Sequence, residues 1–282
     1  MFTKKKSRAQ NTLDSKDSKK RTKLQPFLSV IIPALNEEKY IKQLLEDLKN
    51  QTYRDFEIIV ADAGSKDKTR EIAKKYGAKV VKGGIPSVGR NAGAKVAKGE
   101  YFVFLDADVR LDKNFLLDVY NQIVTKDFNL MAFTSKNVLY SFEKQALTLW
   151  RRLLAKIGAS GANFIGVLMR IFNRPFLGTG LICVKAKVFK ESGGFNVKLT
   201  YAEDNEFIQR ILTKYGDVVV YKKPILASAR RFKKLRTNIG IVVLGPILLV
   251  ILLFGRIFKA QDKSTQIANK AMAFFYGQMG GN

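Results

Sequence analysis

The sequence predicts an α/β fold in which a mainly parallel central sheet is flanked by helices. Short apolar segments of strand character alternate with amphipathic helical segments four times between residues 28 and 125. This alternation is typical of parallel sheets that carry helices on both faces. The chain has 282 residues, of which 46% are hydrophobic. That content is enough for a substantial core and excludes wholesale disorder.

Four apolar segments are expected to form the first strands, because each is short and rich in Val, Ile, Phe or Ala. They span residues 28–33, 56–61, 78–81 and 101–105. Sheets of this kind bind ligands at the carboxyl ends of their strands. The polar side chains that directly follow the strands are therefore the first candidates for a site, and they are Asn36, Glu37, Asp62, Lys82, Asp106 and Asp108.

Helices are expected between these strands. The first opens at residues 36–38 and places an apolar face at spacings i, i+3, i+4 and i+7, formed by Ile41, Leu44, Leu45 and Leu48. Asp67 and Asp112 are predicted to cap the second and fourth helices, and the third lies around residues 88–98. Further along, the pattern predicts an interrupted strand at 176–184, a helix at 204–215 and a last strand at 218–221.

Charge and the rarer residues restrict the possible chemistry. Lys and Arg number 50 against 24 Asp and Glu, a net charge of +26, which points to an anionic partner such as nucleic acid, a membrane surface or a phosphorylated substrate. Histidine is absent, which excludes Ser-His-Asp and Cys-His machinery. With a single cysteine, Cys183, the chain has no internal disulfide and no zinc cluster.

The two ends of the sequence have their own composition. Residues 1–26 are expected to be a basic, disordered tail, or alternatively a foothold on anionic lipid headgroups. Residues 237–255 contain no charged side chain, and at about 1.5 Å per residue they are long enough to cross a bilayer core of about 30 Å. A membrane-embedded or in-plane helix is predicted over 237–258, with a buried core helix as the alternative, and residues 259–282 form a C-terminal tail.

Three groups of acids could carry chemistry. Asp106 and Asp108 can converge on a hard divalent cation, although Asp-rich turns give the same pattern. Asp62 could accept hydrogen bonds from a nucleobase or a ribose, or serve as a turn residue. Glu203 and Asp204 could supply a general base, or simply open a helix, where acids are favoured.

Basic side chains offer possible phosphate contacts. Residues 230–234 read Arg-Arg-Phe-Lys-Lys, which suits either a phosphate clamp or a membrane interface. Arg90 and Asn91 lie in a glycine-bounded segment and could reach a pyrophosphate.

Four sequence blocks stand together in an order and spacing that resemble the donor-binding half of a family 2 glycosyltransferase with the GT-A fold. The blocks are Ser29–Glu38, Ile59–Thr69, Gly89–Gly93 and Gly99–Asp108, and Ala202–Phe207 is similar to the family's Glu-Asp motif. The resemblance covers a domain at residues 27–232, with a donor-binding half at 27–125 and an acceptor half at 126–232.

The resemblance implies a role for each matching residue. The nucleotide pocket would be lined by Pro33, Ala34, Asn36 and Glu37. Asp62 would contact the base or ribose, and Arg90 would lie near the donor phosphates. Asp106 and Asp108 would hold Mg²⁺ or Mn²⁺ and meet the donor. Asp204 would be the catalytic base beside Glu203, and Arg230 or Arg231 would assist the departing diphosphate. Gly178, Thr179 and Gly180 are expected on the acceptor side.

The function implied is inverting, metal-dependent transfer of a sugar from a nucleoside-diphosphate sugar to a lipid-linked or other membrane-proximal glycan acceptor. The Q-x-x-R-W signature of processive synthases is missing, so a non-processive enzyme is expected, membrane-associated with a cytoplasmic catalytic domain. A sugar nucleotidyltransferase is an alternative, although no glycine-rich triphosphate loop precedes the first helix. A basic nucleic-acid-binding protein is another, but no nucleic-acid module is present and no such partner is expected.

Overall fold

The structure is a computed structural model that describes residues 25–133, 138–140, 181–199, 203–216, 218–221, 223 and 225–228. The predicted helix at 237–258, the tail at 259–282 and nearly all of the tail at 1–26 lie outside these residues. Among the residues that are described, no helix is both long and apolar enough to cross a membrane.

The described part of the chain is built on a seven-stranded sheet with the strand order β3-β2-β1-β4-β8-β6-β9. The strands are β1 (Leu28–Ala34), β2 (Phe56–Asp62), β3 (Lys79–Lys82), β4 (Tyr101–Phe104), β6 (Leu130–Phe133), β8 (Ile182–Lys185) and β9 (Val219–Tyr221). All neighbouring pairs are parallel except those of β8, which runs antiparallel to both β4 and β6. The predicted mainly parallel sheet is confirmed.

A smaller sheet lies beside the carboxyl end of β4. It consists of β5 (Val109–Arg110), β10 (Ile225–Ala227) and β7 (Val138–Tyr140), with β10 in the middle. β10 is antiparallel to β5 and parallel to β7. Because β5 starts directly after Asp108, this sheet brings residues from near position 226 back to the end of β4.

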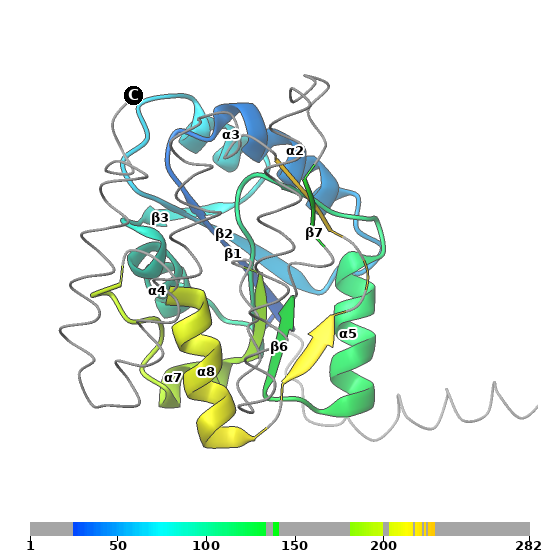
Figure 1. Ribbon diagram of the computed structural model, residues 1–282. Coiled ribbons are helices and arrows are strands. Elements are labelled where there is room, and N and C mark those ends of the chain that lie inside the picture. Colours follow the sequence, from blue (N-terminus) through cyan, green and yellow to red (C-terminus); the bar gives the residue numbers. More distant parts are fainter. Residues whose placement is uncertain are drawn as a thin grey trace, which may run out of the picture.

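Helices cover both faces of the large sheet (Figure 1). They are α2 (Glu38–Lys49), α3 (Thr69–Lys75), α4 (Pro86–Val96), α5 (Phe115–Lys126), α7 (Ala186–Glu191) and α8 (Glu203–Tyr215). Buried residues of α2, α3 and α5 share one core cluster, and those of α4, α7 and α8 share the other. Side chains of β1 alternate between the clusters, with Val30 and Ile32 in the first and Ile31 in the second, as a strand with both faces covered requires.

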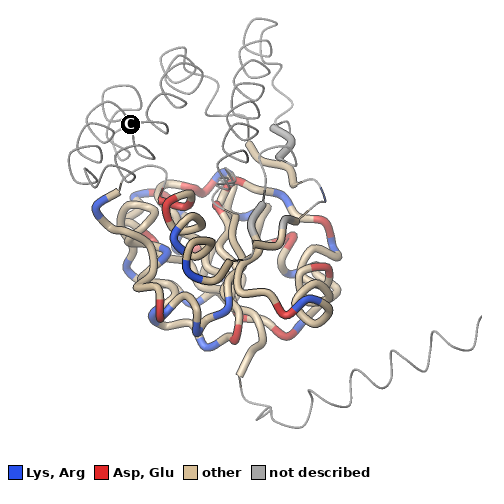
Figure 2. Tube along the Cα trace, turned by 60° about the horizontal axis from the view of Figure 1, so that its bottom comes forward, with Lys and Arg blue, Asp and Glu red and all other residues tan. Residues whose placement is uncertain are grey.

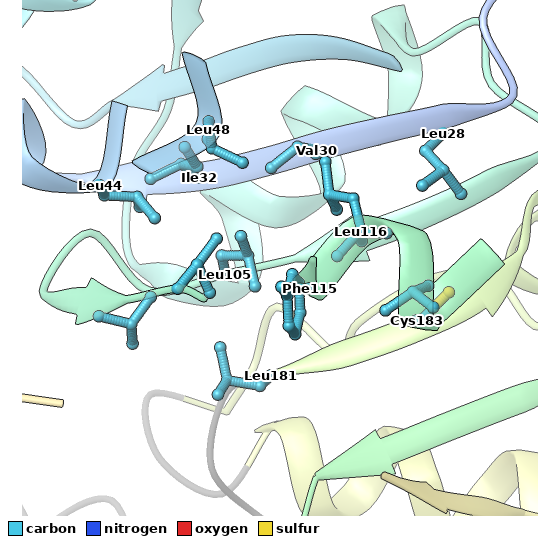
Figure 3. Packing of buried hydrophobic residues seen from close by; sticks show 14 of the residues in the cluster. Leu28, Val30, Ile32, Leu44, Leu48, Leu105, Phe115, Leu116, Leu181 and Cys183 are labelled. Carbon is cyan, nitrogen blue, oxygen red and sulfur yellow. The ribbon is translucent and has the colours of Figure 1, made fainter. Parts of the chain in front are cut away.

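The first core cluster shows why the helical face of α2 was readable from the sequence. Ile41, Leu44, Leu45 and Leu48 are all fully buried. In Figure 3, Leu44 and Leu48 lie near Ile32 of β1, and Phe115 of α5 lies beside Leu105 in the same cluster. The predicted apolar face of this helix is confirmed.

The two predicted helix caps are wrong by one and two residues. α3 has Lys68 at its N-cap and α5 has Asn114. Asp67 instead accepts the backbone N–H of Thr69, and Asp112 accepts that of Asn114. Both carboxylates hydrogen-bond to the backbone two residues ahead, which is the turn geometry that competes with capping.

Helix α4 rests unusually close to β1 because glycine faces the strand. A Cβ on Gly93 would overlap Cγ2 of Ile31, and one on Gly89 would stand 3.2 Å from Cβ of Pro33. Both glycines are buried. This close approach carries Arg90, which lies between them in the sequence, to the carboxyl end of the sheet.

Candidate active site

The loops that follow β1 and β2 are joined to each other by hydrogen bonds. The backbone N–H of Asn36 donates to Oγ of Ser65 at 2.9 Å, and Oδ1 of Asn36 accepts the backbone N–H of Lys66 at 2.9 Å. The Glu37 N–H donates to Oγ1 of Thr69 at 2.8 Å. Asn36 has a φ of 54°, a left-handed conformation that asparagine tolerates better than most residues. Four of the predicted pocket residues, at 33, 34, 36 and 37, therefore lie along one strand end and its fixed loop.

Asp62 is buried at the end of β2 and organises the loop that follows. Its Oδ1 accepts the backbone N–H groups of Gly64 and Ser65, and its Oδ2 accepts the Ser65 hydroxyl. Arg70 lies on its outer side, with Nε 3.7 Å from Oδ1. The carboxylate thus stabilises the turn that follows β2. Its contact with a base or ribose stays a prediction.

Arg90 joins two acids that are far apart in the sequence. Its Nη2 donates to Oδ1 of Asp106 at 2.9 Å, and its Nη1 donates to Oε1 of Glu203. The side chain is only 3% exposed, and its guanidinium lies 5.5 Å from the ring centroid of Phe195. Asp106 and Asp108 form a D-x-D motif. The first carboxylate of this motif and the first acid of the Glu-Asp motif therefore meet on one buried cation.

The electrostatics of this cluster favour the charged form of Arg90 and disfavour the charged form of Glu203. Burial alone would lower the pKa of Arg90, but the neighbouring carboxylates of Glu203, Asp106 and Asp204 outweigh it and raise the pKa above its ordinary value. Burial raises the pKa of Glu203, and the contact with Arg90 counteracts part of that rise. Nε of Arg90 is buried and has no hydrogen-bond partner among the described residues, which leaves one polar atom for a ligand or a water to satisfy.

The two acids at the start of α8 differ in their surroundings. Glu203 is buried against Arg90. Asp204 is partly exposed, and its Oδ1 accepts the backbone N–H of Asn205 at 2.7 Å. Asp204 is thus the more accessible carboxylate, while Glu203 anchors the helix to the cluster.

The D-x-D acids offer the donor chemistry of a hard divalent cation. Asp106 has a side chain that is 19% exposed, whereas Asp108 is buried and its carbonyl accepts the Ser228 N–H at 3.0 Å. Two carboxylates leave most of an octahedral shell to phosphate oxygens and water, as Mg²⁺ sites commonly do. Within the described ranges, no group of three or more acids or cysteines gathers at one point to form a closed metal cage. The residues present fit a cation shared with a substrate.

Two residues that the sequence did not single out as positioning groups hold the loop in front of α8. The amide of Asn91 donates to the Phe195 carbonyl and accepts the Phe195 N–H. Arg210 pairs with Glu206 on its own helix and donates to the carbonyls of Ser192 and Gly194. The only signal for Arg210 was its i,i+4 spacing from Glu206, and that spacing is equally common on solvated helix faces.

Some predicted site residues are not part of the described structure. Arg230, Arg231, Gly178, Thr179 and Gly180 lie outside the described residues. The nearest described position to the arginine pair is Ser228, which is hydrogen-bonded to Asp108.

The chain is similar in sequence to known glycosyltransferases. A family model described as "Glycosyl transferase family 2" matches residues 29–191, more than half of the chain. The chain is similar to an uncharacterized glycosyltransferase of Rickettsia typhi, 37% identical over 116 residues, 38% of this chain and 36% of that protein. It is also similar to poly(ribitol-phosphate) beta-N-acetylglucosaminyltransferase TarS of Staphylococcus aureus, 38% identical over 100 residues, 32% of this chain and 18% of that protein. The matched stretch thus spans well under half the length of these curated relatives.

Two solved structures share the fold at low sequence identity. One is a fragment of S. aureus TarS in complex with UDP-GlcNAc, with a TM-score of 0.56, 22% identity, and coverage of 80% of this chain and 66% of that one. The other is the mannosyltransferase PcManGT of Pyrobaculum calidifontis in complex with GDP-Man and Mn²⁺, with a TM-score of 0.53, 16% identity, and coverage of 91% and 76%.

Proposed function

Because the chain belongs to glycosyl transferase family 2, we propose that it is an inverting, non-processive glycosyltransferase that uses a nucleoside-diphosphate sugar. The observation that carries this proposal is the cluster of Arg90, Asp106 and Glu203, in which two of the four resembling sequence blocks meet the Glu-Asp motif. Family membership favours glycosyl transfer over the alternatives of a nucleotidyltransferase and a nucleic-acid-binding protein.

The donor would lie along the carboxyl edge of the sheet. Its base and ribose would lie against the joined loops of Asn36 and Asp62, and its diphosphate would extend toward the end of β4. In similar proteins the donors named are UDP-GlcNAc and GDP-Man, so both nucleotides are candidates here. Asp106 and Asp108 would hold a divalent cation, which would supply positive charge to stabilise the departing nucleoside diphosphate.

Asp204 is proposed as the general base. The acceptor hydroxyl oxygen forms a bond to the anomeric carbon while the bond from that carbon to the diphosphate oxygen breaks, and the hydroxyl proton passes to the Asp204 carboxylate. Its partial exposure supports this role over Glu203, whose Oε1 is held by Arg90. Arg90 would act as a positioning residue, because it holds α8, the helix that carries Asp204, next to the D-x-D motif. Arg230 or Arg231 would add positive charge near the leaving group.

The acceptor is proposed to be a lipid-linked glycan or another glycan presented at a membrane. This part of the proposal rests on the uncharged segment at 237–255 and on the basic residues 230–236. The TarS relative acts, by its name, on poly(ribitol-phosphate), which makes an anionic glycopolymer a further candidate acceptor.

A thermal-shift screen of the full chain tests the proposal directly. Ligands that bind only the folded state raise the melting temperature, so UDP-GlcNAc or GDP-Man with Mn²⁺ is expected to stabilise the protein more than either component alone. Asp106→Asn should remove the Mn²⁺-dependent part, whereas Asp127→Asn, an exposed acid on the loop after α5, should not. If nucleoside triphosphates stabilise the chain and no nucleoside-diphosphate sugar does, the result supports a nucleotidyltransferase and contradicts the proposed glycosyl transfer.

A further inference from the structure

One edge of the large sheet carries a concentration of positive charge that the proposed transfer reaction does not use. We call it the basic edge, and it consists of Lys66, Lys68, Arg70, Lys74, Lys75, Lys79 and Lys82. All seven side chains are exposed, and the same segment contains only two acids, Asp67 and Glu71. Its net charge is therefore +5 over 17 residues.

The fold explains why these side chains face solvent together. β3 is the outermost strand of the sheet, and its first and last residues, Lys79 and Lys82, are exposed. Figure 1 shows α3 and β3 next to each other at this rim. α3 buries Thr69 and Ala73 and leaves its lysines outside. Elsewhere on the described chain, positive and negative side chains are interspersed (Figure 2). The basic edge differs because its charges are predominantly positive.

The acids near the basic edge form no ion pairs with its lysines in the described part of the chain. Asp67 accepts hydrogen bonds from Thr69 and from the Glu38 N–H. Among the described residues, no ion pair joins a lysine of the basic edge to an acid; the edge's one ion pair is between Arg70 and Asp62. On neighbouring α2, by contrast, Lys42 pairs with Glu46 at 3.8 Å.

The shape of the basic edge suits an extended partner better than a small anion. A shallow recess of about 670 Å³ is lined by Glu38, Lys66, Asp67, Lys68, Arg70, Glu71 and Lys74. Three acids against four basic residues make that recess nearly neutral. The excess charge comes from the lysines beyond it, Lys75, Lys79 and Lys82, which are spread along the rim.

We propose that the basic edge docks the protein onto an anionic phospholipid bilayer. Six of its seven residues are lysine, whose compact ammonium groups suit diffuse attraction to a charged surface. Lys82 stands in register with Asp62 at the carboxyl end of β2, so a bilayer at this edge lies beside the candidate active site. Docking would bring the candidate site close to a lipid-linked acceptor, and this benefit rests on the proposed function. The docking itself does not depend on the proposed function.

Vesicle co-sedimentation of the full chain tests the docking. The test variant is Lys74→Gln/Lys75→Gln/Lys79→Gln, and the matched control is Lys126→Gln/Lys190→Gln/Lys214→Gln, three exposed lysines in the last turns of other helices. With about 30 mol% phosphatidylglycerol in phosphatidylcholine, the test variant should bind roughly 100-fold more weakly than the parent, because each basic residue near such a surface contributes about a fivefold factor. The control should stay within about threefold of the parent. Other basic segments are identical in all three proteins.

Three outcomes would overturn the proposal: equal losses in test and control variants, equal binding of the parent to pure phosphatidylcholine, or a loss confined to duplex DNA binding while vesicle binding persists. Melting temperature and donor-induced stabilisation, measured without vesicles, should be the same in all three proteins. If the parent itself shows no donor-induced stabilisation while the vesicle difference holds, the proposed function fails and the docking stands.

Discussion

Arg90 is the residue on which the candidate site depends most. It lies on α4, yet its guanidinium bonds to Asp106 after β4 and to Glu203 at the start of α8. A buried cation between two carboxylates offsets their desolvation, and removing it leaves charges unpaired in the interior. We therefore assign Arg90 a positioning role. The sequence predicted only that Arg90 would lie near the donor phosphates.

Arg90→Gln is expected to lower the free energy of unfolding by about 3–5 kcal/mol, because both acids lose their partner. Arg90→Lys should recover part of that loss. Urea denaturation measures it, and Arg110→Gln is the control: Arg110 also pairs with an aspartate, Asp47, but is partly exposed, so about 1 kcal/mol or less is expected. Equal losses at the two positions would contradict the buried bridge.

Asp67 gives a pH-dependent prediction. Burial alone would raise its pKa, but hydrogen bonds from the Thr69 hydroxyl and from the N–H groups of Glu38 and Thr69 outweigh this and lower the pKa below 3.8. A lowered pKa in the folded state means that the carboxylate stabilises the fold above pH 3.8, and that this contribution is lost as the pH falls through the folded-state pKa.

Asp67→Asn should therefore cost about 1 kcal/mol at neutral pH, and the difference from the parent protein should shrink below pH 3.8. Urea denaturation at neutral and acidic pH measures both values. A difference that is constant with pH would show that the charge of Asp67 contributes nothing.

At the scale of elements, the packing of α4 on β1 is the most demanding contact. Gly93→Ala should destabilise the protein by about 1–3 kcal/mol, because the new methyl group meets Ile31 in a filled core. Gly89→Ala gains the same helix propensity of about 1 kcal/mol, and its new Cβ would lie 3.2 Å from Cβ of Pro33, a weaker clash. It should therefore destabilise the protein less than Gly93→Ala. Thermal denaturation ranks the two, and the reverse order would show that α4 does not rest on the strand through Gly93.

The sequence predicted long, self-contained elements better than short ones. The first four strands and α2 were visible because each has an apolar pattern of its own. β5 has two residues and β10 has three, so their existence is decided by pairing with each other and with β7 rather than by local pattern. α7 was missed for the same reason, since six residues are too few to show a helical period.

At the scale of the whole molecule, the fold joins sequence motifs that are far apart. The order of the strands could predict that Asp62 and Asp106 lie at one edge of the sheet. It could not predict that Glu203 would reach the same edge, because that depends on how α8 packs against β6 and on the loop held by Asn91 and Arg210. Part of the net charge of +26 is also located, since residues 66–82, which contain the basic edge, carry +5 of it at one rim of the sheet.

The role of Asp204 as general base is tested by the turnover of Asp204→Asn, measured as nucleoside diphosphate released from the donor that stabilises the parent protein. Asp204 is partly exposed at the site, and its neighbour Glu203 holds the helix to Arg90. We expect turnover to fall at least 100-fold, the low end for loss of a general base, with donor-induced stabilisation retained. Unchanged turnover in Asp204→Asn would show that Asp204 is not the general base and that the proposed transfer mechanism is wrong.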